Sequence, residues 1–531
     1  MLSDAATLHR LTRHGSSLDA ADRQRLVAFR PLDPSNRPSP FKRYVGREPV
    51  PLPREFGLSS VRAADALSGG PRGVVEMPWD RERLARLLFF SNGVSRTSRS
   101  TSGDAFYFRT AMSAGNLHPV EIYVVCGDFG GVAAGVYHFA PLEFGLTELR
   151  LGDHRGALAD AAADPQIADA PVTLVLTGIP WRTAWKYGER GFRHLYWDAG
   201  TMLGNLLAVE PSASIRVGFV DQQVGRLVDV DRLWEHPLAL VVSQGSDHPR
   251  NGRAVEHTRT PELLGLAVEP IARAPLVFPL ITAAQRDGDL ADRAAVVWWR
   301  TAAAALGASA VVSVEPPATG SDDPIEAVIL RRGSTRLMRR ETVDGELLTW
   351  GLGAATRAVA GDFAGEGATL LEHFVSVHDV GGVAPGAYRL RRNRLELRHA
   401  GQQRDIAAHL CYDQPLGGDA AYTAFHSTDL DHVLGVLGSR GYRATQLEAG
   451  IAAGRLALAA FTLGDGATSL TFYDDEVAQY FDTRTACMLV TAVGEPDYRN
   501  TAGGPPGAPT ELAHYGPLME RLSLQLHRAR F

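Results

Sequence analysis

One stretch of this chain occurs twice, first as Glu121-Ile-Tyr-Val-Val-Cys-Gly-Asp-Phe-Gly-Gly-Val-Ala-Ala-Gly-Val-Tyr-His-Phe139. The second copy reads Glu372-His-Phe-Val-Ser-Val-His-Asp-Val-Gly-Gly-Val-Ala-Pro-Gly-Ala-Tyr-Arg-Leu390, at a constant offset of 251 residues. Nine of the 19 aligned positions are identical, and Glu, Asp and Tyr are among them, which chance similarity between Gly/Ala/Val-rich stretches does not explain. Self-similarity at a fixed offset indicates a duplicated structural unit.

The residues that flank the repeat match in the same way. Asp198-Ala-Gly200 parallels Glu448-Ala-Gly450, and Phe219-Val-Asp221 parallels Phe472-Tyr-Asp474. We therefore predict an α+β protein whose two tandem domains pack as a pseudo-dimer within one chain. The predicted boundaries are 1–57 for an N-terminal extension that wraps the core, 58–250 for domain 1, 251–322 for a connector, 323–500 for domain 2 and 501–531 for a C-terminal tail.

The hydrophobic pattern supports a mixed architecture. Apolar side chains recur every three or four residues between Phe192 and Leu207, which predicts a long buried helix. The Pro-rich residues 31–53 are expected to run extended over a surface, and a helical piece is expected near 294–306. Runs rich in β-branched residues predict strands at 120–126, 172–177 and 238–243.

Composition excludes several classes of protein. Of 531 residues, 45% are hydrophobic and 21% are charged, which is typical of a packed globular protein. With a net charge of −6 and no basic stripe, no nucleic-acid partner is predicted, and no apolar run is long enough to span a membrane. The three cysteines form no Cys-x-x-Cys pair and the 17 histidines show no zinc-like spacing, so no metal site and a cytoplasmic location are expected.

The positive charges are distributed unevenly between the two basic residue types. Lys42 and Lys186 are the only lysines among the 54 Lys and Arg residues. Arg cannot lose its proton near neutral pH, whereas a buried Lys can, so a lysine retained in this background is a candidate for proton transfer. Survival of the two lysines by chance is the alternative.

Four motifs of the first half occur in the order and spacing of a known family. They are Leu84–Val94, Arg109–Pro119, Gly135–His138 and Trp185–Arg190, and they resemble the SagB/ThcOx-type dehydrogenases of the FMN-dependent nitroreductase-like superfamily. The second half adds Arg332-Gly-Ser-Thr-Arg336, which is similar to the Arg-x-Ser-x-Arg flavin motif of the superfamily. The resemblance covers residues 25–245 well and residues 323–500 more weakly.

This resemblance implies a fold, a cofactor and an activity. Family members are α+β homodimers that bind FMN between their subunits, so two tandem nitroreductase-like domains forming an intrachain pseudo-dimer are expected. Known activities include oxidation of thiazoline and oxazoline rings to thiazoles and oxazoles on modified peptides, with molecular oxygen as the expected electron acceptor. The resemblance therefore implies a peptide substrate, brought by a partner cyclodehydratase or a recognition protein.

The residues expected to bind FMN are divided between the two domains. The guanidinium groups of Arg332 and Arg336 and the hydroxyl of Ser334 suit phosphate and the electron-rich edge of a flavin, although a solvated basic helix start is the alternative. The first copy has 69–73 at this position and lacks the motif. Conversely, the first domain offers a loop that has no match at 364–367, and its predicted flavin contacts are Ser113, Ala114, Gly115 and Asn116.

Because each domain has kept a complementary half, we expect one composite FMN site per chain. In family homodimers the two motifs at one flavin come from opposite subunits. A Gly turn before the strand is the alternative reading of residues 113–116. The weaker candidates are Tyr473, in the loop expected against the reactive edge of the flavin, and Arg499, which could reach its phosphate.

Lys186 and Tyr187 are the predicted catalytic pair. Oxidation of an azoline requires that a proton leave one ring carbon while a hydride leaves its neighbour. A lysine with a pKa lowered by burial can accept that proton, or it can stabilise a neighbouring tyrosinate that does so. The family carries a Lys-Tyr pair in this role, and a surface lysine before a buried helix is the alternative.

The sequence leaves two other functions open. One is an NAD(P)H-dependent nitro- or quinone-type reductase, which would not depend on Lys186. The other is a catalytically silent scaffold of a peptide-modifying complex. The oligomeric state is left open as well.

Overall fold

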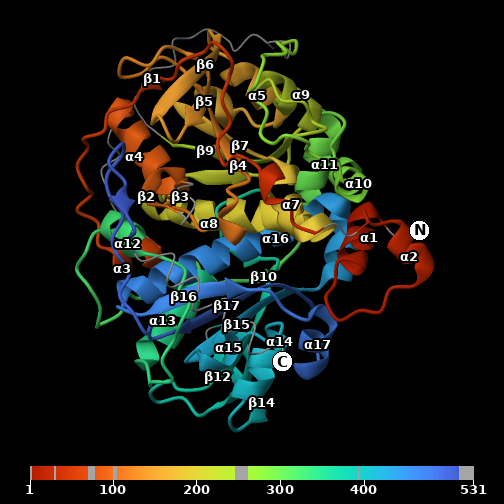
Figure 1. The fold of residues 1–531 in the computed structure, drawn as a ribbon, viewed down its shortest axis with the longest axis vertical. Helices are drawn as coiled ribbons and strands as arrows, with labels where there is room; N and C mark the ends of the chain where they lie inside the picture. Colours follow the sequence, from red (N-terminus) through yellow and green to blue (C-terminus); the bar gives the residue numbers. More distant parts are fainter. Residues whose placement is uncertain are drawn as a thin grey trace.

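The computed structural model describes residues 3–28, 31–69, 78–99, 105–244, 261–392 and 394–513. It contains two antiparallel sheets with a pair of long helices between them (Figure 1). Most of the predicted 69–73 segment and residues 514–531 of the predicted tail lie outside the described residues. No helix in the described ranges has the length and apolar character needed to cross a membrane.

The two sheets have the same topology. The first has the order β1-β6-β5-β4-β7-β9-β8 and the second the order β14-β13-β12-β15-β17-β16, so the second lacks only a counterpart of β1. The strands of the first sheet are β1 (Val50–Pro51), β4 (Val120–Cys126), β5 (Gly135–Ala140), β6 (Gly145–Leu151), β7 (Val172–Gly178), β8 (Ser214–Arg216) and β9 (His236–Val242). Those of the second are β12 (Glu372–Val377), β13 (Gly386–Arg391), β14 (Arg394–Ala400), β15 (Tyr422–Thr428), β16 (Gly466–Leu470) and β17 (Ala486–Gly494).

The internal repeat forms the same hairpin in both sheets, β4–β5 and β12–β13. Every residue of β4 and β7 is buried, which explains why their sequences show continuous apolar runs instead of alternation. The prediction of two tandem α+β domains that form a pseudo-dimer within the chain is confirmed.

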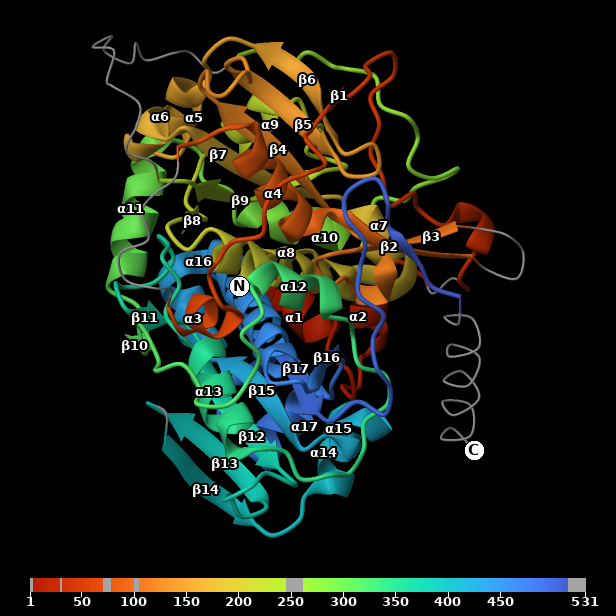
Figure 2. The ribbon, with the colours of Figure 1, turned by 90° about the vertical axis from the view of Figure 1, so that its left-hand side faces the viewer.

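The interface between the halves is built by α8 (Gly191–Val209) and α16 (Leu430–Thr462), which pack side by side between the sheets (Figure 2). A Cβ atom on Gly200 would collide with the carbonyl oxygen of Leu447, and one on Gly450 would lie 2.5 Å from that of Trp197. These two glycines end the matched Asp198–Gly200 and Glu448–Gly450 motifs. The two backbones touch there, so no side chain fits at either position.

Reciprocal ion pairs cross the interface. Asp474, which opens α17 (Asp474–Tyr480), accepts hydrogen bonds from Arg193 at 2.6 Å and from Arg190 at 2.9 Å. Asp221, which opens α9 (Asp221–Leu227), accepts from Arg440 at 2.6 Å and Arg443 at 2.9 Å. The carboxylate of each domain thus binds two arginines of the other, as in an isologous dimer.

The N-terminal segment and the connector each contribute a pair of helices. α1 (Asp4–Leu11) packs against α10 (Pro279–Asp287), and the two lie on the same side of the molecule as α2 (Ala20–Gln24) and α11 (Arg293–Ala304) (Figure 1). Arg193 donates to the carbonyl oxygen of His9 near the end of α1, while Arg440 donates to that of Gly288 after α10. The remaining helices are α3 (Ala63–Ser68), α4 (Arg81–Asn92), α5 (Arg155–Ala161), α6 (Gln166–Asp169), α7 (Pro180–Tyr187), α12 (Ile325–Arg331), α13 (Gly345–Ala355), α14 (Arg404–Leu410) and α15 (Pro415–Asp419), with short 3-10 turns η1 (Pro34–Asn36), η2 (Ala114–Asn116) and η3 (Gly188–Arg190).

Short strands complete the fold. β2 (Val94–Arg99) pairs with β3 (Ala105–Arg109) and with β18 (Thr510–Glu511), which joins the last described part of the chain to the first domain. β10 (Ala308–Ser309) pairs with β11 (Ala368–Thr369). The extension runs past domain 1 and adds β1 to the free edge of β6.

Candidate functional site

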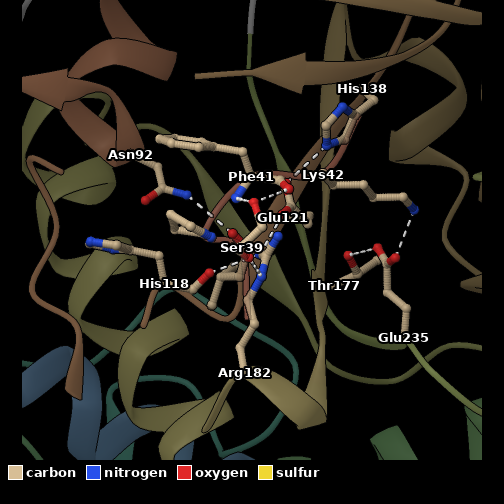
Figure 3. Close-up of polar contacts among 12 residues, drawn as sticks. Ser39, Phe41, Lys42, Asn92, His118, Glu121, His138, Thr177, Arg182 and Glu235 are labelled. Atoms are coloured by element: carbon tan, nitrogen blue, oxygen red, sulfur yellow. Dashed lines mark hydrogen bonds and ion pairs between the residues drawn. The ribbon is translucent and has the colours of Figure 1, made fainter. Parts of the chain in front are cut away.

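α7 is fixed in the first domain by a buried arginine. Arg182 has no exposed surface and donates to Glu121 on β4 at 2.5 Å and to the carbonyl oxygen of His118 at 2.9 Å (Figure 3). It also donates to the carbonyl oxygen of Ser39 in the extension, at 2.9 Å. One side chain therefore positions α7 relative to the sheet, to the loop before β4 and to the N-terminal extension.

Lys42 lies in a second buried cluster beside this one (Figure 3). Its Nζ donates to Tyr123 Oη and to Glu235 Oε2, each at 2.7 Å, and Thr177 donates to the other oxygen of Glu235 at 2.6 Å. Burial alone would lower the pKa of Lys42, but the charge of Glu235 and the contact with Tyr44 raise it above its usual value. Lys42 therefore stays charged and anchors the extension.

Lys186 has the opposite electrostatic environment. It lies in the last turn of α7, which ends at Gly188 with φ 56°, and its Nζ is 5.4 Å from the centre of the Tyr187 ring. Although the Lys186 side chain is exposed, the atoms around it remove part of its hydration, and with the charges of Arg336 and Arg37 this lowers its pKa. Burial and the charge of Asp198 raise the pKa of Tyr187, whose ring stacks on His194 at 4.1 Å.

The predicted loop contacts this pair directly. Residues 114–116 form η2, where Gly115 and Asn116 have φ of 62° and 57°. A Cβ atom on Gly115 would lie 2.9 Å from Tyr187 Oη and 3.3 Å from Lys186 Cδ. Only glycine allows the loop to approach the pair this closely.

The Arg-x-Ser-x-Arg segment reaches the same place from the second domain. It is extended and follows α12, and Arg336 lies near enough to Lys186 and Tyr187 for its charge to act on the pKa of both. Arg332 is buried and donates to the carbonyl oxygen of Thr110 at 2.7 Å, while its Nε has no hydrogen-bond partner. Burial and the neighbouring Arg96 lower the pKa of Arg332 to about 9, so this is a cation that an anion would stabilise.

The other predicted contacts are arranged less directly. Ser334 forms an isolated bridge with Ala467. Arg499 is exposed between Tyr498, whose hydroxyl accepts from the Arg336 amide at 3.0 Å, and Asn500, which lies against Gly333. Arg499 therefore lies beside the motif.

Tyr473 packs against the end of α14 and the residues that follow it. Its hydroxyl donates to Asp413 at 2.6 Å, and its ring packs on Tyr412 and His409, each at 5.0 Å between ring centres. The preceding Phe472 packs toward the site, with its ring 6.3 Å from that of Trp197. The predicted loop is adjacent to the site, but the Tyr473 side chain contacts the α14 region instead.

The pseudo-symmetric position in the other half has different side chains. Gly438, with φ 62° and ψ −161°, corresponds to Gly188, with φ 56° and ψ −144°, so Val436 and Leu437 stand where Lys186 and Tyr187 stand. Trp299 of α11 is buried there and donates to the carbonyl oxygen of Leu437 at 3.1 Å. A Cβ atom on Gly218 would lie 3.1 Å from the Trp299 ring. We call the region around Gly188 the first corner and the equivalent region around Gly438 the second corner. Trp299 of the connector therefore fills the second corner.

Sequence reasoning missed one residue at the site, Asp198. This carboxylate is buried on α8 and accepts from Ser113 Oγ at 2.6 Å. The parallel with Glu448 in the repeat was the signal that could have identified it. No group of residues arranged to ligate a metal occurs in the described part of the chain.

Comparison with known proteins identifies relatives of the chain. No family model matches it. A protein of Methanocaldococcus jannaschii that is named as a nitroreductase is 31% identical over 169 residues, which make up 31% of this chain and 80% of that protein. The crystal structure of an Anabaena variabilis protein, also named as a nitroreductase, superposes with a TM-score of 0.66 at 23% identity and covers 93% of this chain and 100% of its own.

A microcin synthetase complex of E. coli with truncated pro-MccB17 bound overlaps 44% of this chain, but its TM-score of 0.27 is too low to support any inference. The Anabaena superposition shows the fold over nearly the whole length. The identity to most of the archaeal protein shows the relationship in sequence. The chain belongs to the nitroreductase family.

Proposed function

We propose that this protein is an FMN-dependent dehydrogenase that oxidises thiazoline or oxazoline rings of a modified peptide to thiazoles or oxazoles. The observation that carries the proposal is Lys186, a lysine with a lowered pKa beside Tyr187, next to Arg336 of the other domain. A reductase that takes its hydride from a nicotinamide has no need of such a base. A ring oxidation does, because a carbon-bound proton must be removed.

The residues around this pair fit a flavin phosphate and its ring. Arg332 is a buried cation with an unpartnered Nε, and the nearest charged group that acts on it is another cation, Arg96. Gly115 gives the close backbone approach that a flat ring requires. Arg332, Ser334, Arg336 and residues 113–116 would hold the cofactor, with Arg499 near the phosphate. Bound FMN supplies the two-electron acceptor for the oxidation, and molecular oxygen is the proposed terminal acceptor.

The protein's own part in the reaction is the transfer of a proton. Loss of hydration and the charges of Arg336 and Arg37 favour the neutral amine of Lys186, which can accept the proton from the ring carbon. The Tyr187 hydroxyl keeps its proton, because burial and Asp198 raise its pKa, so it acts as a hydrogen-bond donor while Lys186 is the base. Arg182 fixes α7 and with it the position of the pair.

One flavin per chain is proposed. The corner that would form a second site contains the indole of Trp299 between Leu437 and Gly218, and Arg300 beside it donates to the carbonyl oxygen of Ala162 at 2.7 Å. A peptide delivered by a partner protein would therefore meet a single reactive site.

Quantification of the flavin released by denaturation, followed by assay on an azoline peptide, tests the proposal. One FMN per chain and oxygen-dependent conversion of azoline to azole are expected. Two flavins per chain would contradict the composite site. A colourless protein that takes up no added FMN would favour the scaffold.

A nitro- or quinone-reductase activity is the alternative that family membership favours. It predicts direct bleaching of the flavin by NAD(P)H, with a rate that is the same in the wild type and in Lys186→Ala. The two activities are thus separated by one spectrum and one variant.

A further inference from the structure

Asp198 lies directly beneath the loop that touches Lys186 and Tyr187. The carboxylate is buried on α8, and Ser113 Oγ donates to its Oδ2 at 2.6 Å. The Ala114 amide donates to both carboxylate oxygens, at 3.1 and 3.2 Å. The start of the loop is therefore tied to the long helix through Asp198, and Thr201 of the same helix donates to the carbonyl oxygen of the preceding Met112 at 3.0 Å.

The loop is a tight turn. Gly115, Asn116 and His118 all have positive φ, of 62°, 57° and 46°, a region that glycine adopts freely and that Asn and His adopt more often than most other residues. The hydroxyl of Ser113 also accepts from the His118 amide at 2.8 Å, so the contact with Asp198 continues to the far end of the loop. His118 Nε2 and Asn116 Oδ1 lie 2.8 Å apart and complete the turn.

The second domain also has a buried carboxylate that holds a loop, but no Lys-Tyr pair beside it. Glu448, the counterpart of Asp198 in the repeat, accepts from Thr369 Oγ1 at 2.7 Å and from the Leu370 amide at 2.9 Å. Burial raises the pKa of both carboxyls, Asp198 and Glu448, to about 7. The anchor is thus inherited by both copies, but only in the first does it support a loop that contacts a lysine and a tyrosine.

We propose that Asp198 is the positioning residue of the active site: through Ser113 and Ala114 it presses the 113–118 loop onto Lys186 and Tyr187 and so fixes the base for proton transfer. This inference rests on the proposed function only for the identity of the reaction. The groups that face Tyr187 are Lys186, His194, Arg336 and Asp198 itself, and Asp198 is the single anion among them. Loss of Asp198 therefore changes both the hydration of Lys186 and the charge next to Tyr187.

The test uses the near absence of lysine from the chain. Reductive methylation with 13C-formaldehyde labels Lys186, Lys42 and the N-terminal amine, and Lys186→Arg assigns the Lys186 signal. The pKa of labelled Lys186 is then measured by NMR in the full chain of wild type, Asp198→Asn, Ser113→Ala and the matched control Glu448→Gln. In the first two variants the loop packs less closely on Lys186, its side chain becomes more fully hydrated, and its pKa rises toward the ordinary lysine value. In Glu448→Gln it stays at the wild-type value.

Kinetics of the flavin-loaded enzyme give a second readout. Asp198→Asn and Ser113→Ala are expected to lower kcat about 10- to 100-fold with less than a threefold change in KM, since a small misplacement of a catalytic group costs this much. The alkaline limb of the pH profile moves to lower pH in Asp198→Asn, because Tyr187 loses a neighbouring anion. Ser113→Ala keeps the test decisive if Asp198→Asn does not fold.

The outcomes separate this inference from the proposed function. An unchanged Lys186 pKa and kcat in both variants would overturn the positioning role even if the protein oxidises azolines. A shifted Lys186 pKa in a protein with no azoline activity would support the positioning role and reject the substrate. Equal shifts in Glu448→Gln would mean that the effect is global, and would overturn the inference.

Discussion

The corner at Gly188 and the corner at Gly438 have nearly the same backbone and different side chains. The first presents Lys186 and Tyr187 to a site shared with Arg336, and the second presents Val436 and Leu437 to the buried indole of Trp299. The interface between them is preserved, with Asp474 and Asp221 each binding two arginines across it. Both halves therefore keep the same backbone at this position, but only the first has the proposed catalytic side chains.

The largest expected difference is in turnover, when Lys186 of the first corner and Val436 of the second are each replaced by alanine. Lys186→Ala should lower turnover by about 10²- to 10⁴-fold, the usual contribution of a general base, while flavin stays bound. Val436→Ala, at the equivalent position, should leave turnover within about twofold. Steady-state oxidation of an azoline peptide measures both, and equal rates in Lys186→Ala and the wild type would remove the lysine from the mechanism.

Both sets of reciprocal ion pairs should stabilise the fold, but only one should affect cofactor binding. Asp474→Asn leaves two buried arginines without a carboxylate, which should cost about 3 to 5 kcal/mol of unfolding free energy in urea denaturation, and Asp221→Asn should cost less, because Arg443 keeps an ion pair with Asp289 at 3.3 Å. Only Asp474 follows the loop beside the proposed flavin, so only Asp474→Asn should weaken FMN binding in a fluorescence titration. Equal loss of FMN affinity in both variants would contradict a single site.

Replacing Trp299 tests whether its indole alone keeps FMN out of the second corner. Trp299→Ala should cost about 3 kcal/mol of stability, because a large buried ring is replaced by a cavity. The flavin content should remain at one per chain, since the first copy has no Arg-x-Ser-x-Arg motif to bind a second flavin. Appearance of a second FMN after the substitution would show that the indole alone excludes it.

The smallest expected effect concerns Glu448, and its sign follows from its raised pKa. The carboxyl binds its proton more tightly in the folded than in the unfolded protein, so its contribution to stability falls as the pH rises from the unfolded value toward about 7. Between pH 5.5 and 7.0 the wild type should lose about 1.6 kcal/mol relative to Glu448→Gln. Urea denaturation at both pH values measures the difference, and a constant gap would mean that the carboxyl titrates normally.

The elements that could be predicted from the sequence are those with a regular apolar pattern or a repeated segment. Strand 120–126 was predicted with the bounds of β4, and the helix expected at 192–207 is α8, which is slightly longer, because buried elements have strong apolar patterns. α10 was missed, because it is short and continues an apolar run interrupted by prolines, in which no helical spacing stands out. The constant offset also predicted 364–367 opposite the 113–116 loop, whereas the contacts with Glu448 make Thr369 and Leu370 its counterparts, because the loop is shorter in the second domain.

Side-chain direction was the part that the sequence could not supply. Tyr473 lies in the expected loop, but an acceptor on Asp413 and two aromatic rings draw its side chain to the α14 region. Asp198 belongs to a repeated motif, but its contact with the 113–118 loop becomes visible only in the folded chain. In both cases the deciding contact joins residues far apart in the chain.

The covalent link between the halves has a consequence for how this protein can change. In a symmetric dimer every mutation is made twice, so an indole that filled one corner would fill both and abolish the activity. Joining the copies into one reading frame removes that constraint, while the touching glycines of α8 and α16 keep the old interface intact. One half can then lose its chemistry and acquire other uses while natural selection still acts on the other.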